Sequence, residues 1–299
     1  MFGILPILLT PFNEDTSVDW NSLENLVDLY LKSRVDGITC LGEVSETDFL
    51  EPEEKRNIIE LCVDKFKGKT VVAGVSGNHQ QMVKEAIEAQ KLGVSAVLVP
   101  PAGKTEEEIF RHYLDLDSSI SIPSVILDHP SQERPVMSAE LIARITSDSE
   151  RIKFLKIEDT PTVAKMERLR NLTGNDVTIY GASHGRYFYW ELLRGARGLM
   201  TSSPVPSMHV EIWNSFIKGD LERSEDLFYH SIPVAFFMEN IPVKVKKEVM
   251  VYLGVFKSSQ MRKKGQSISE SSIKDLREVI DWTAKYCRSK GIEIQNSSN

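Results

Sequence analysis

A lysine followed closely by two acidic residues is the part of this sequence best suited to chemistry. Lys156 ends a short apolar run, and Glu158 and Asp159 come just after it, before a helix-starting segment at residues 160–162. At the mouth of a β/α unit, half burial would favour the neutral amine, which attacks carbonyl groups and forms a Schiff base. The alternative interpretation is an ion pair of Lys156 with Glu158 or Asp159, because such pairs outnumber catalytic lysines.

Length and composition describe a globular chain with no bias toward a polyanionic partner. The chain has 299 residues, of which 41% are hydrophobic, and its 43 acidic and 36 basic residues give a net charge of -7. A negative chain is not attracted to nucleic acid or to anionic membranes. No apolar run approaches the roughly 20 residues of a membrane span, and the first residues lack signal-peptide features. We therefore expect a cytoplasmic protein that binds neither nucleic acid nor membranes.

Metal-binding patterns are weak. The three cysteines share no short spacing typical of a zinc site, and their odd number suits a reducing compartment. Four possible metal ligands follow apolar runs, namely His79, Asp128, His129 and His184. A metal-dependent barrel could gather them, but no His-x-His pair stands at the end of a run. We expect no metal.

Short apolar runs alternate with amphipathic helical segments over the first three-quarters of the chain. The eight runs are residues 3–10, 38–41, 71–75, 96–99, 125–127, 154–157, 177–180 and 198–201. Asp19 is placed to cap the first helix and Pro52 to open the second. The pattern predicts an α/β fold, a (β/α)8 TIM barrel. A doubly wound sheet would need a glycine-rich phosphate loop after its first strand, and residues 10–14 are not one.

The last quarter of the chain has a purely helical pattern. Helices are expected at residues 221–237, 243–253 and 273–286, with no linker rich in Gly, Ser or Pro before them. We therefore predict a barrel over residues 1–219 and a C-terminal helical extension over residues 220–299 that packs on it.

Polar side chains follow the apolar runs, where the active site of such a barrel lies. They include Thr10, Glu43, Ser45, Asn78, His79, Asp128, His129, Lys156, Glu158 and His184. Such a ring indicates catalysis without identifying a reaction. The turn at residues 42–46 could bind a carboxylate through its backbone amides and the Ser45 hydroxyl. Equally, it could be an acidic loop that caps the helix opened by Pro52.

Taken together, these motifs resemble the dihydrodipicolinate synthase and N-acetylneuraminate lyase family of class I aldolases, with this chain as a divergent member. The resemblance runs from Gly3 to about Leu253. Its anchor points are residues 9–12, Gly42 with Glu46, residues 123–130, Leu155 with Lys156, Gly181, residues 195–198 and residues 241–244.

The resemblance implies a role for each matching position. Lys156 would form an imine with the keto group of pyruvate or another 2-oxo acid, and this covalent imine replaces any cofactor. We add Glu43 and Asp128 to Lys156 as expected catalytic residues, and we expect Ser45, Thr10, His129, Glu158, Gly181 and Met200 to bind the substrate. The family also implies a homotetramer built as a dimer of dimers.

Four departures from the family pattern bear on the reaction. Leu127 stands where the family has a proton-relaying tyrosine, and Glu43 and Val44 replace two hydroxyl residues. Gln132 stands where the dihydrodipicolinate branch has an arginine that binds a second carboxylate. Residues 100–102 lack the paired tyrosines through which that branch passes protons across its dimer. These changes make lysine biosynthesis an unfavoured task.

We therefore expect a Schiff-base lyase that cleaves, condenses or dehydrates 2-oxo acids such as a 2-oxo-3-deoxy sugar acid. Glu43 is the first choice to replace the tyrosine, since burial opposite the lysine would raise its pKa toward neutrality. Asp128 and His129 rank behind it. Each also has a structural alternative. Glu43 could cap a helix, Asp128 could accept a structural hydrogen bond, and His129 could be a packed loop residue. Two alternatives are a true dihydrodipicolinate synthase and a non-catalytic barrel that binds a keto acid.

Overall fold

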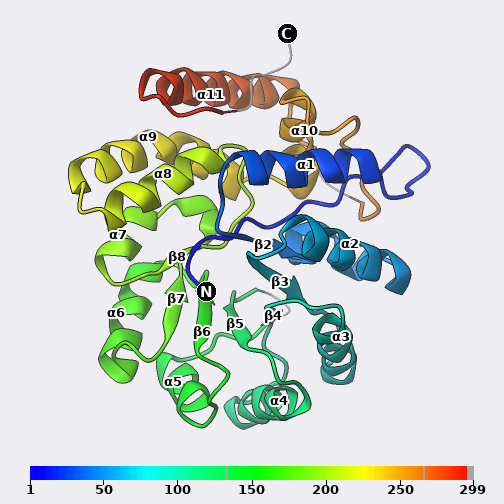
Figure 1. The fold of residues 1–299 in the computed structure, drawn as a ribbon, viewed down its shortest axis with the longest axis vertical. Coiled ribbons are helices and arrows are strands. Elements are labelled where there is room, and N and C mark those ends of the chain that lie inside the picture. Colours follow the sequence, from blue (N-terminus) through cyan, green and yellow to red (C-terminus); the bar gives the residue numbers. More distant parts are fainter. Residues whose placement is uncertain (132–133, 265–266, 295–299) are drawn as a thin grey trace.

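The central feature of the fold is a ring of parallel strands enclosed by helices (Figure 1). The computed structural model describes residues 1–131, 134–264 and 267–294. Within these ranges the strands are β1 Gly3–Ile4, β2 Gly37–Cys40, β3 Thr70–Gly74, β4 Ala96–Val99, β5 Ser124–Asp128, β6 Phe154–Ile157, β7 Thr178–Tyr180 and β8 Gly198–Leu199. Their order along the chain is their order around the ring.

The ring closes at both sides of β1. Strands β2 to β7 pair in sequence, β1 pairs with β8, and isolated bridges join Ile7 to Thr39 and Gly181 to Leu199. The predicted (β/α)8 barrel is therefore confirmed. The first strand is shorter than the expected residues 3–10, because Pro6 has no N–H to donate to a neighbouring strand.

Each strand is followed by a helix whose start is marked in the sequence. The helices of the barrel are α1 Trp20–Lys32, α2 Pro52–Lys65, α3 His79–Lys91, α4 Glu106–Ser119, α5 Ala139–Ser147, α6 Thr162–Thr173, α7 Phe188–Leu193 and α8 Pro206–Ile217. Asp19 accepts a hydrogen bond from the Ser22 amide at 3.1 Å, and Pro52 opens α2, as predicted. The sequence analysis did not identify α4, although Thr105 and Glu108 form a capping box at its start.

Side chains inside the barrel form a separate apolar layer. It consists of Leu5, Val72, Ala96, Leu98, Val125, Leu127, Tyr180 and Met200. Successive residues of a strand point to opposite faces, so Leu127 faces the interior while the next residue, Asp128, faces the helices. Lys156 pairs in register with Leu127 and shares its direction. The alternation of side chains along β5 and β6 thus decides which polar residues can reach the mouth of the barrel.

Three helices follow the barrel, namely α9 Leu221–Glu239, α10 Val243–Tyr252 and α11 Glu270–Ser289. Figure 1 shows α11 at one end of the molecule, beyond α9 and α10, and it contacts both. Of the described helices, none combines the length and apolar character needed to cross a bilayer. The division of the chain at residue 219 stays a prediction.

Closure between β1 and β8 gives a test of the fold. Gly198 has a φ of +149°, and a Cβ there would lie 1.9 Å from the Gly3 carbonyl oxygen. We expect Gly198→Ala to lower the free energy of unfolding by about 3 kcal/mol, because the two strands must separate to admit the methyl group.

Urea denaturation measures this loss. Gly219→Ala is the matched control, since Gly219 also has a positive φ, +81°, but its Cβ would meet nothing within 4 Å. The control should lose only about 1 kcal/mol. Equal losses for the two variants would show that the contact with Gly3 is not what makes Gly198 necessary.

Candidate active site

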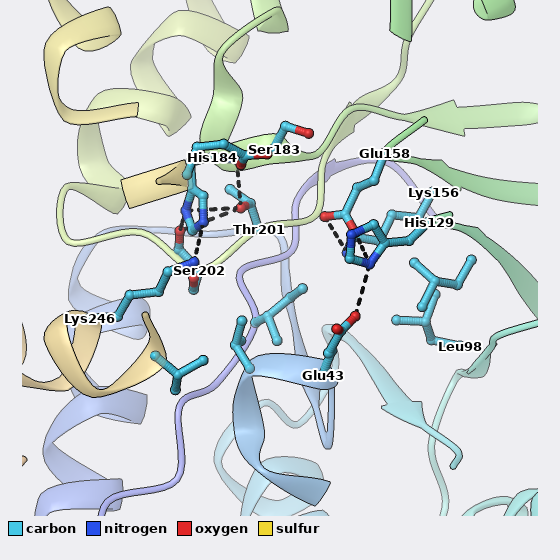
Figure 2. Close-up of a pocket in the computed structure, with 15 residues that line it drawn as sticks. Glu43, Leu98, His129, Lys156, Glu158, Ser183, His184, Thr201, Ser202 and Lys246 are labelled. Carbon is cyan, nitrogen blue, oxygen red and sulfur yellow. Dashed lines mark hydrogen bonds and ion pairs between the residues drawn. The ribbon is translucent and has the colours of Figure 1, made fainter. Parts of the chain in front are cut away.

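A polar cavity of about 230 Å³ lies at the carboxyl ends of the strands (Figure 2). It is lined by residues of β4, β5 and β6, of the turn after β2, of the loops after β1, β5, β6, β7 and β8, and of α9 and α10. This volume lies just below the roughly 300–1,000 Å³ that is common for ligand pockets, so the cavity suits only a small molecule. The helical extension contributes to it through α9 and α10.

Lys156 reaches this cavity from the end of β6. Its side chain is only 5% exposed, and Nζ donates a hydrogen bond of 2.8 Å to Oε1 of Glu158. Burial raises the pKa of Glu158, but the positive charges of Lys156 and His129 outweigh burial and hold the pKa below its usual value. Glu158 is therefore an ionised base in contact with the amine. The ion pair of Lys156 with Glu158 that the sequence suggested is therefore present, and it lies inside a cavity.

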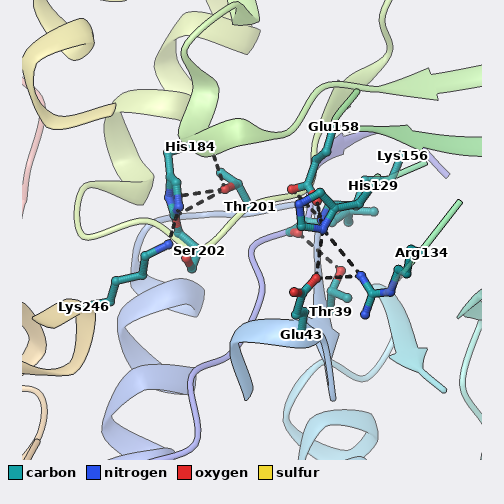
Figure 3. Close-up of polar contacts among 11 residues, drawn as sticks. Thr39, Glu43, His129, Arg134, Lys156, Glu158, His184, Thr201, Ser202 and Lys246 are labelled. Carbon is teal, nitrogen blue, oxygen red and sulfur yellow. Dashed lines mark hydrogen bonds and ion pairs between the residues drawn. The ribbon is translucent and has the colours of Figure 1, made fainter. Parts of the chain in front are cut away.

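Glu158 belongs to a chain of polar contacts that crosses one wall of the cavity (Figure 3). His129 Nδ1 lies 3.4 Å from Oε2 of Glu158 and donates to Oε2 of Glu43 at 2.9 Å. Arg134 Nη1 donates to the same oxygen of Glu43 at 2.7 Å. The hydrogen bond to Glu43 raises the pKa of His129, against the opposing effect of burial. Along this wall each of the two carboxylates thus has its own basic partner, Lys156 for Glu158 and Arg134 for Glu43, with His129 between them.

These contacts contradict the expectation that the pKa of Glu43 is raised toward neutrality. Burial raises the pKa of Glu43, but the hydrogen bond from His129 and the charge of Arg134 together hold it far below its usual value. Its side chain is also 49% exposed. Glu43 therefore faces the cavity as a carboxylate, and the prediction of a near-neutral pKa is wrong.

The opposite wall carries a second lysine beside a histidine (Figure 2). His184 Nδ1 lies 2.9 Å from the Ser202 carbonyl oxygen, and Nε2 lies 2.8 Å from Lys246 Nζ. Because a carbonyl can only accept, Nδ1 carries the proton and Nε2 accepts from the Lys246 ammonium. Burial holds the pKa of His184 well below its usual value and lowers the pKa of Lys246 to about 8. A neutral imidazole therefore orients a buried cation.

The backbone that presents His184 is strained. Ser183 and His184 both have positive φ values, 47° and 54°, within the short helix η3 Ser183–Gly185. Each such non-glycine residue costs on the order of 1–3 kcal/mol and persists where the surroundings impose it. Here the His184 amide donates to Thr201 Oγ1 at 3.1 Å, which holds the turn against β8.

A buried ion pair joins the two walls. Glu46 in the turn after β2 pairs with Lys247 of α10, and both side chains are almost fully buried, at 2% and 0% exposure. Glu46 Oε2 also accepts from the backbone amides of Arg262 and Lys263, at 3.0 and 2.8 Å. The turn that carries Glu43 and the helix that carries Lys246 are therefore held together.

Asp128, predicted to be catalytic, does not line the cavity. It lies on the outer face of β5 and pairs with Lys165 of α6 at 2.8 Å. Burial raises its pKa to about 6, although Lys165 opposes the shift. Asp128 pairs in register with Ile157, so its side chain points to the outer face of the sheet, away from the face that carries Lys156. Its structural role, left open in the sequence analysis, is the one that the geometry supports.

Four predicted substrate-binding residues also lie outside the cavity. Ser45 Oγ donates to the Leu8 carbonyl at 2.5 Å and Thr10 Oγ1 donates to the Ser45 carbonyl at 2.7 Å, so both hydroxyls are engaged. Met200 belongs to the apolar layer inside the barrel.

Gly181 is the fourth of these residues, and it packs against buried Glu191. A Cβ on Gly181 would lie 1.9 Å from Oε2 of Glu191. Burial raises the pKa of Glu191 to about 8, and its Oε1 accepts from the Thr162 hydroxyl at 2.6 Å. Gly181 therefore leaves room for a buried carboxylic acid. Of the nine predicted site residues, the cavity brings together Lys156, Glu43, His129 and Glu158.

Residues that the sequence analysis did not assign to the site complete it. Lys246 and Ser202 line the cavity, and Arg134 reaches it through Glu43. An arginine is thus present four residues after Pro130, although Gln132, where the family has its arginine, lies outside the described residues. Lys246 lies two positions after the last anchor of the family resemblance, on a helix with two other lysines, Lys244 and Lys247. That spacing carries no signal of a site.

The described residues contain no group of three or more His, Cys, Asp or Glu side chains that could hold a metal ion. His79 instead contacts His112, with 2.8 Å between their Nδ1 atoms. The expectation that no metal takes part stays a prediction.

The fold and the cavity define a (β/α)8-barrel protein with a buried amine at the mouth of the barrel. Residues 1–282 match the family model described as the dihydrodipicolinate synthetase family. The chain belongs to this family, which confirms the resemblance found in its motifs.

The similarity extends over nearly the whole chain at low identity. A 4-hydroxy-tetrahydrodipicolinate synthase of Fervidobacterium nodosum is 28% identical over 287 residues, which cover 93% of this chain and 97% of the relative. A dihydrodipicolinate synthase structure from Rhodopseudomonas palustris superimposes with a TM-score of 0.87 at 26% identity, covering 94% of this chain and 97% of that chain. Identities at this level make the protein a divergent member.

A further solved structure is similar in fold alone. It is YagE, a prophage protein of the dihydrodipicolinic acid synthase family from E. coli K12, in complex with pyruvate. It superimposes with a TM-score of 0.86 at 19% identity, covering 95% of this chain and 98% of that chain.

The contact between Glu43 and His129 can be tested by titration. We expect Glu43→Gln to lower the pKa of His129, because the amide removes the carboxylate whose hydrogen bond raises it. NMR titration of the His129 ring measures the change. Glu239→Gln is the control, since Glu239 lines the same cavity but does not pair with His129. An unchanged His129 pKa in Glu43→Gln would contradict the contact.

Proposed function

We propose that this protein is a Schiff-base lyase that acts on pyruvate or another 2-oxo acid. The observation that carries the proposal is the position of Lys156, which is 4% exposed, faces the cavity and contacts a carboxylate. A buried lysine with an adjacent base is the arrangement needed to supply a neutral amine to a keto group. Membership in the family supports the same chemistry.

The proton balance of imine formation fits the contacts of Lys156. Its ammonium gives one proton to Glu158, and the neutral amine adds to the keto carbon to form a carbinolamine. Glu158 then returns its proton to the departing hydroxyl, which leaves as water, and the protonated imine remains. This iminium group withdraws electrons during C–C cleavage, condensation or loss of a β-hydroxyl, so no cofactor is needed.

Glu158 replaces Glu43 as our first choice for the proton relay. Among the described carboxylates, Glu158 is the one in contact with Lys156, whereas Glu43 is held by His129 and Arg134. His129 lies between the two carboxylates, and its Nδ1–H helps to keep Glu158 ionised and ready to accept the proton of Lys156. The family tyrosine is then dispensable, and Leu127 supplies only an apolar surface beside the imine.

A 2-oxo-3-deoxy sugar acid is the substrate class that we favour. Serine, threonine and histidine side chains on the wall opposite Lys156 suit a hydroxylated chain. Condensation of pyruvate with aspartate semialdehyde, the alternative suggested by the synthase relatives, is less favoured because Leu127 and residues 100–102 lack the proton-transfer groups of that branch. The dimer-of-dimers tetramer rests on the family resemblance, and the cytoplasmic location stays a prediction from the sequence.

A non-catalytic barrel that only binds a keto acid is the second candidate. The observation that favours it is the replacement of the family tyrosine by Leu127. Turnover of any 2-oxo acid separates the two functions.

Reductive trapping tests the imine. We expect borohydride in the presence of pyruvate to give a covalent adduct on Lys156, identified by peptide mass spectrometry, and Lys156→Arg to abolish it. Lys153→Arg is the matched control. Lys153 lies just before the first residue of β6, at the opposite end from Lys156, and its Nζ donates to the Thr146 carbonyl oxygen. Adducts confined to surface lysines, or none with pyruvate and other 2-oxo acids, would refute the proposal.

Comparison of two carboxylate variants tests the relay. We expect Glu158→Gln to slow imine trapping by about a hundredfold to ten-thousandfold, the range of general acid–base catalysis. Glu43→Gln should slow it much less, since Glu43 acts on Lys156 only through His129 and Glu158. Rapid-quench trapping gives both rates. A larger effect of Glu43→Gln would restore Glu43 as the relay.

A further inference from the structure

Lys246 is a buried cation without a carboxylate partner in the described part of the chain. Its side chain is 7% exposed, and no described carboxylate oxygen lies within 4 Å of its Nζ. Its hydrogen-bond partner is the neutral imidazole of His184. Glu239 lies on the same wall but is engaged by Arg186 at 3.8 Å. An isolated charge is expensive to bury, so its retention indicates that an anion completes the site.

A second unpaired group lies beside Lys246. Ser202 is 2% exposed and lines the cavity, and among the described residues its Oγ has no hydrogen-bond partner. Figure 2 shows Ser202 next to Lys246 and His184, on the wall opposite Lys156. A buried hydroxyl without a partner is uncommon in a folded protein. Together the ammonium and the hydroxyl provide donors for one small anion.

The other cations at the cavity are already engaged. Arg134 is neutralised by Glu43, and Lys156 by Glu158, and His129 lies between these two carboxylates. Among the described residues, their wall therefore offers an anion no cation that is free of a carboxylate, whereas the wall of α10 offers Lys246. The strained turn at Ser183 and His184 holds the imidazole against Lys246, which fits a site under functional constraint.

We propose that Lys246 and Ser202 bind a carboxylate at the end of the substrate remote from its keto carbon. The inference rests on the proposed function, because imine formation at Lys156 places the keto carbon on the opposite wall. Within the 2-oxo-3-deoxy sugar acids proposed above, the substrate class is therefore one with a second, terminal carboxylate. A carboxylate suits this site better than a phosphate, since one ammonium and one hydroxyl leave a dianion with several unmatched oxygens. His184 is a positioning residue that fixes the direction of the ammonium.

Reductive trapping with two matched acids tests this proposal. 2-Oxoglutarate and 2-oxopentanoate have chains of equal length and differ only in the terminal carboxylate. We expect the wild type to be half-saturated for trapping on Lys156 at a concentration of 2-oxoglutarate roughly tenfold or more below that of 2-oxopentanoate. Lys246→Met should lower this preference by roughly tenfold to a hundredfold, and Ser202→Ala should lower it in the same direction.

The preference is the ratio of the half-saturating concentrations of the two acids, measured on one protein. A substitution that slows imine formation with both acids equally therefore leaves this ratio unchanged. Lys244→Met is the control, because it removes the same charge from the same helix outside the cavity, and it should keep the wild-type preference. Should Lys246→Met lose affinity equally for both acids, the lysine acts on the keto end and the proposal fails. A wild type that traps pyruvate but shows no preference overturns this inference alone. Absence of any adduct on Lys156 overturns the proposed function, and this inference with it.

Discussion

The register between β5 and β6 is the constraint on which the site depends. It places Leu127 and Lys156 side by side on the inner face of the barrel, and Asp128 with Ile157 on the outer face. Because side chains alternate along each strand, a shift by one residue would put an aspartate beside the cavity and bury the amine against α6. Lys156 therefore owes its access to the cavity to the ladder of hydrogen bonds that fixes this register.

Charge is divided unevenly between the two walls of the cavity. The wall formed by β5, β6 and the turn after β2 holds two carboxylates with their cations, whereas the wall formed by α10 holds Lys246 beside a neutral histidine. The buried pair of Glu46 and Lys247 keeps the walls together, since one residue belongs to each. A ligand that bridges them meets a base at one end and a cation at the other.

The replacement of the family tyrosine by Leu127 is consistent with this arrangement. A carboxylate in direct contact with Lys156 already exists in Glu158, and His129 connects that carboxylate to Glu43. The same arrangement explains why Glu43 is ionised. A carboxylate that accepts hydrogen bonds from a histidine and an arginine is stabilised in its charged form, and partial burial does not reverse this.

The sequence by itself determined the barrel, several helix starts and the lysine at the mouth, because these follow from local patterns such as apolar runs, Asp19 as a cap and Pro52 at a helix start. Only the tertiary structure decided which polar residues share the cavity. Asp128 and Lys156 look alike in sequence, and the parity of their strands separates them. Lys246 and Ser202 meet only because α10 folds back over β8, and no spacing along the chain records that contact. Protonation also depends on distances in space, so the charge of Glu43 followed from Arg134 and His129 rather than from its own position.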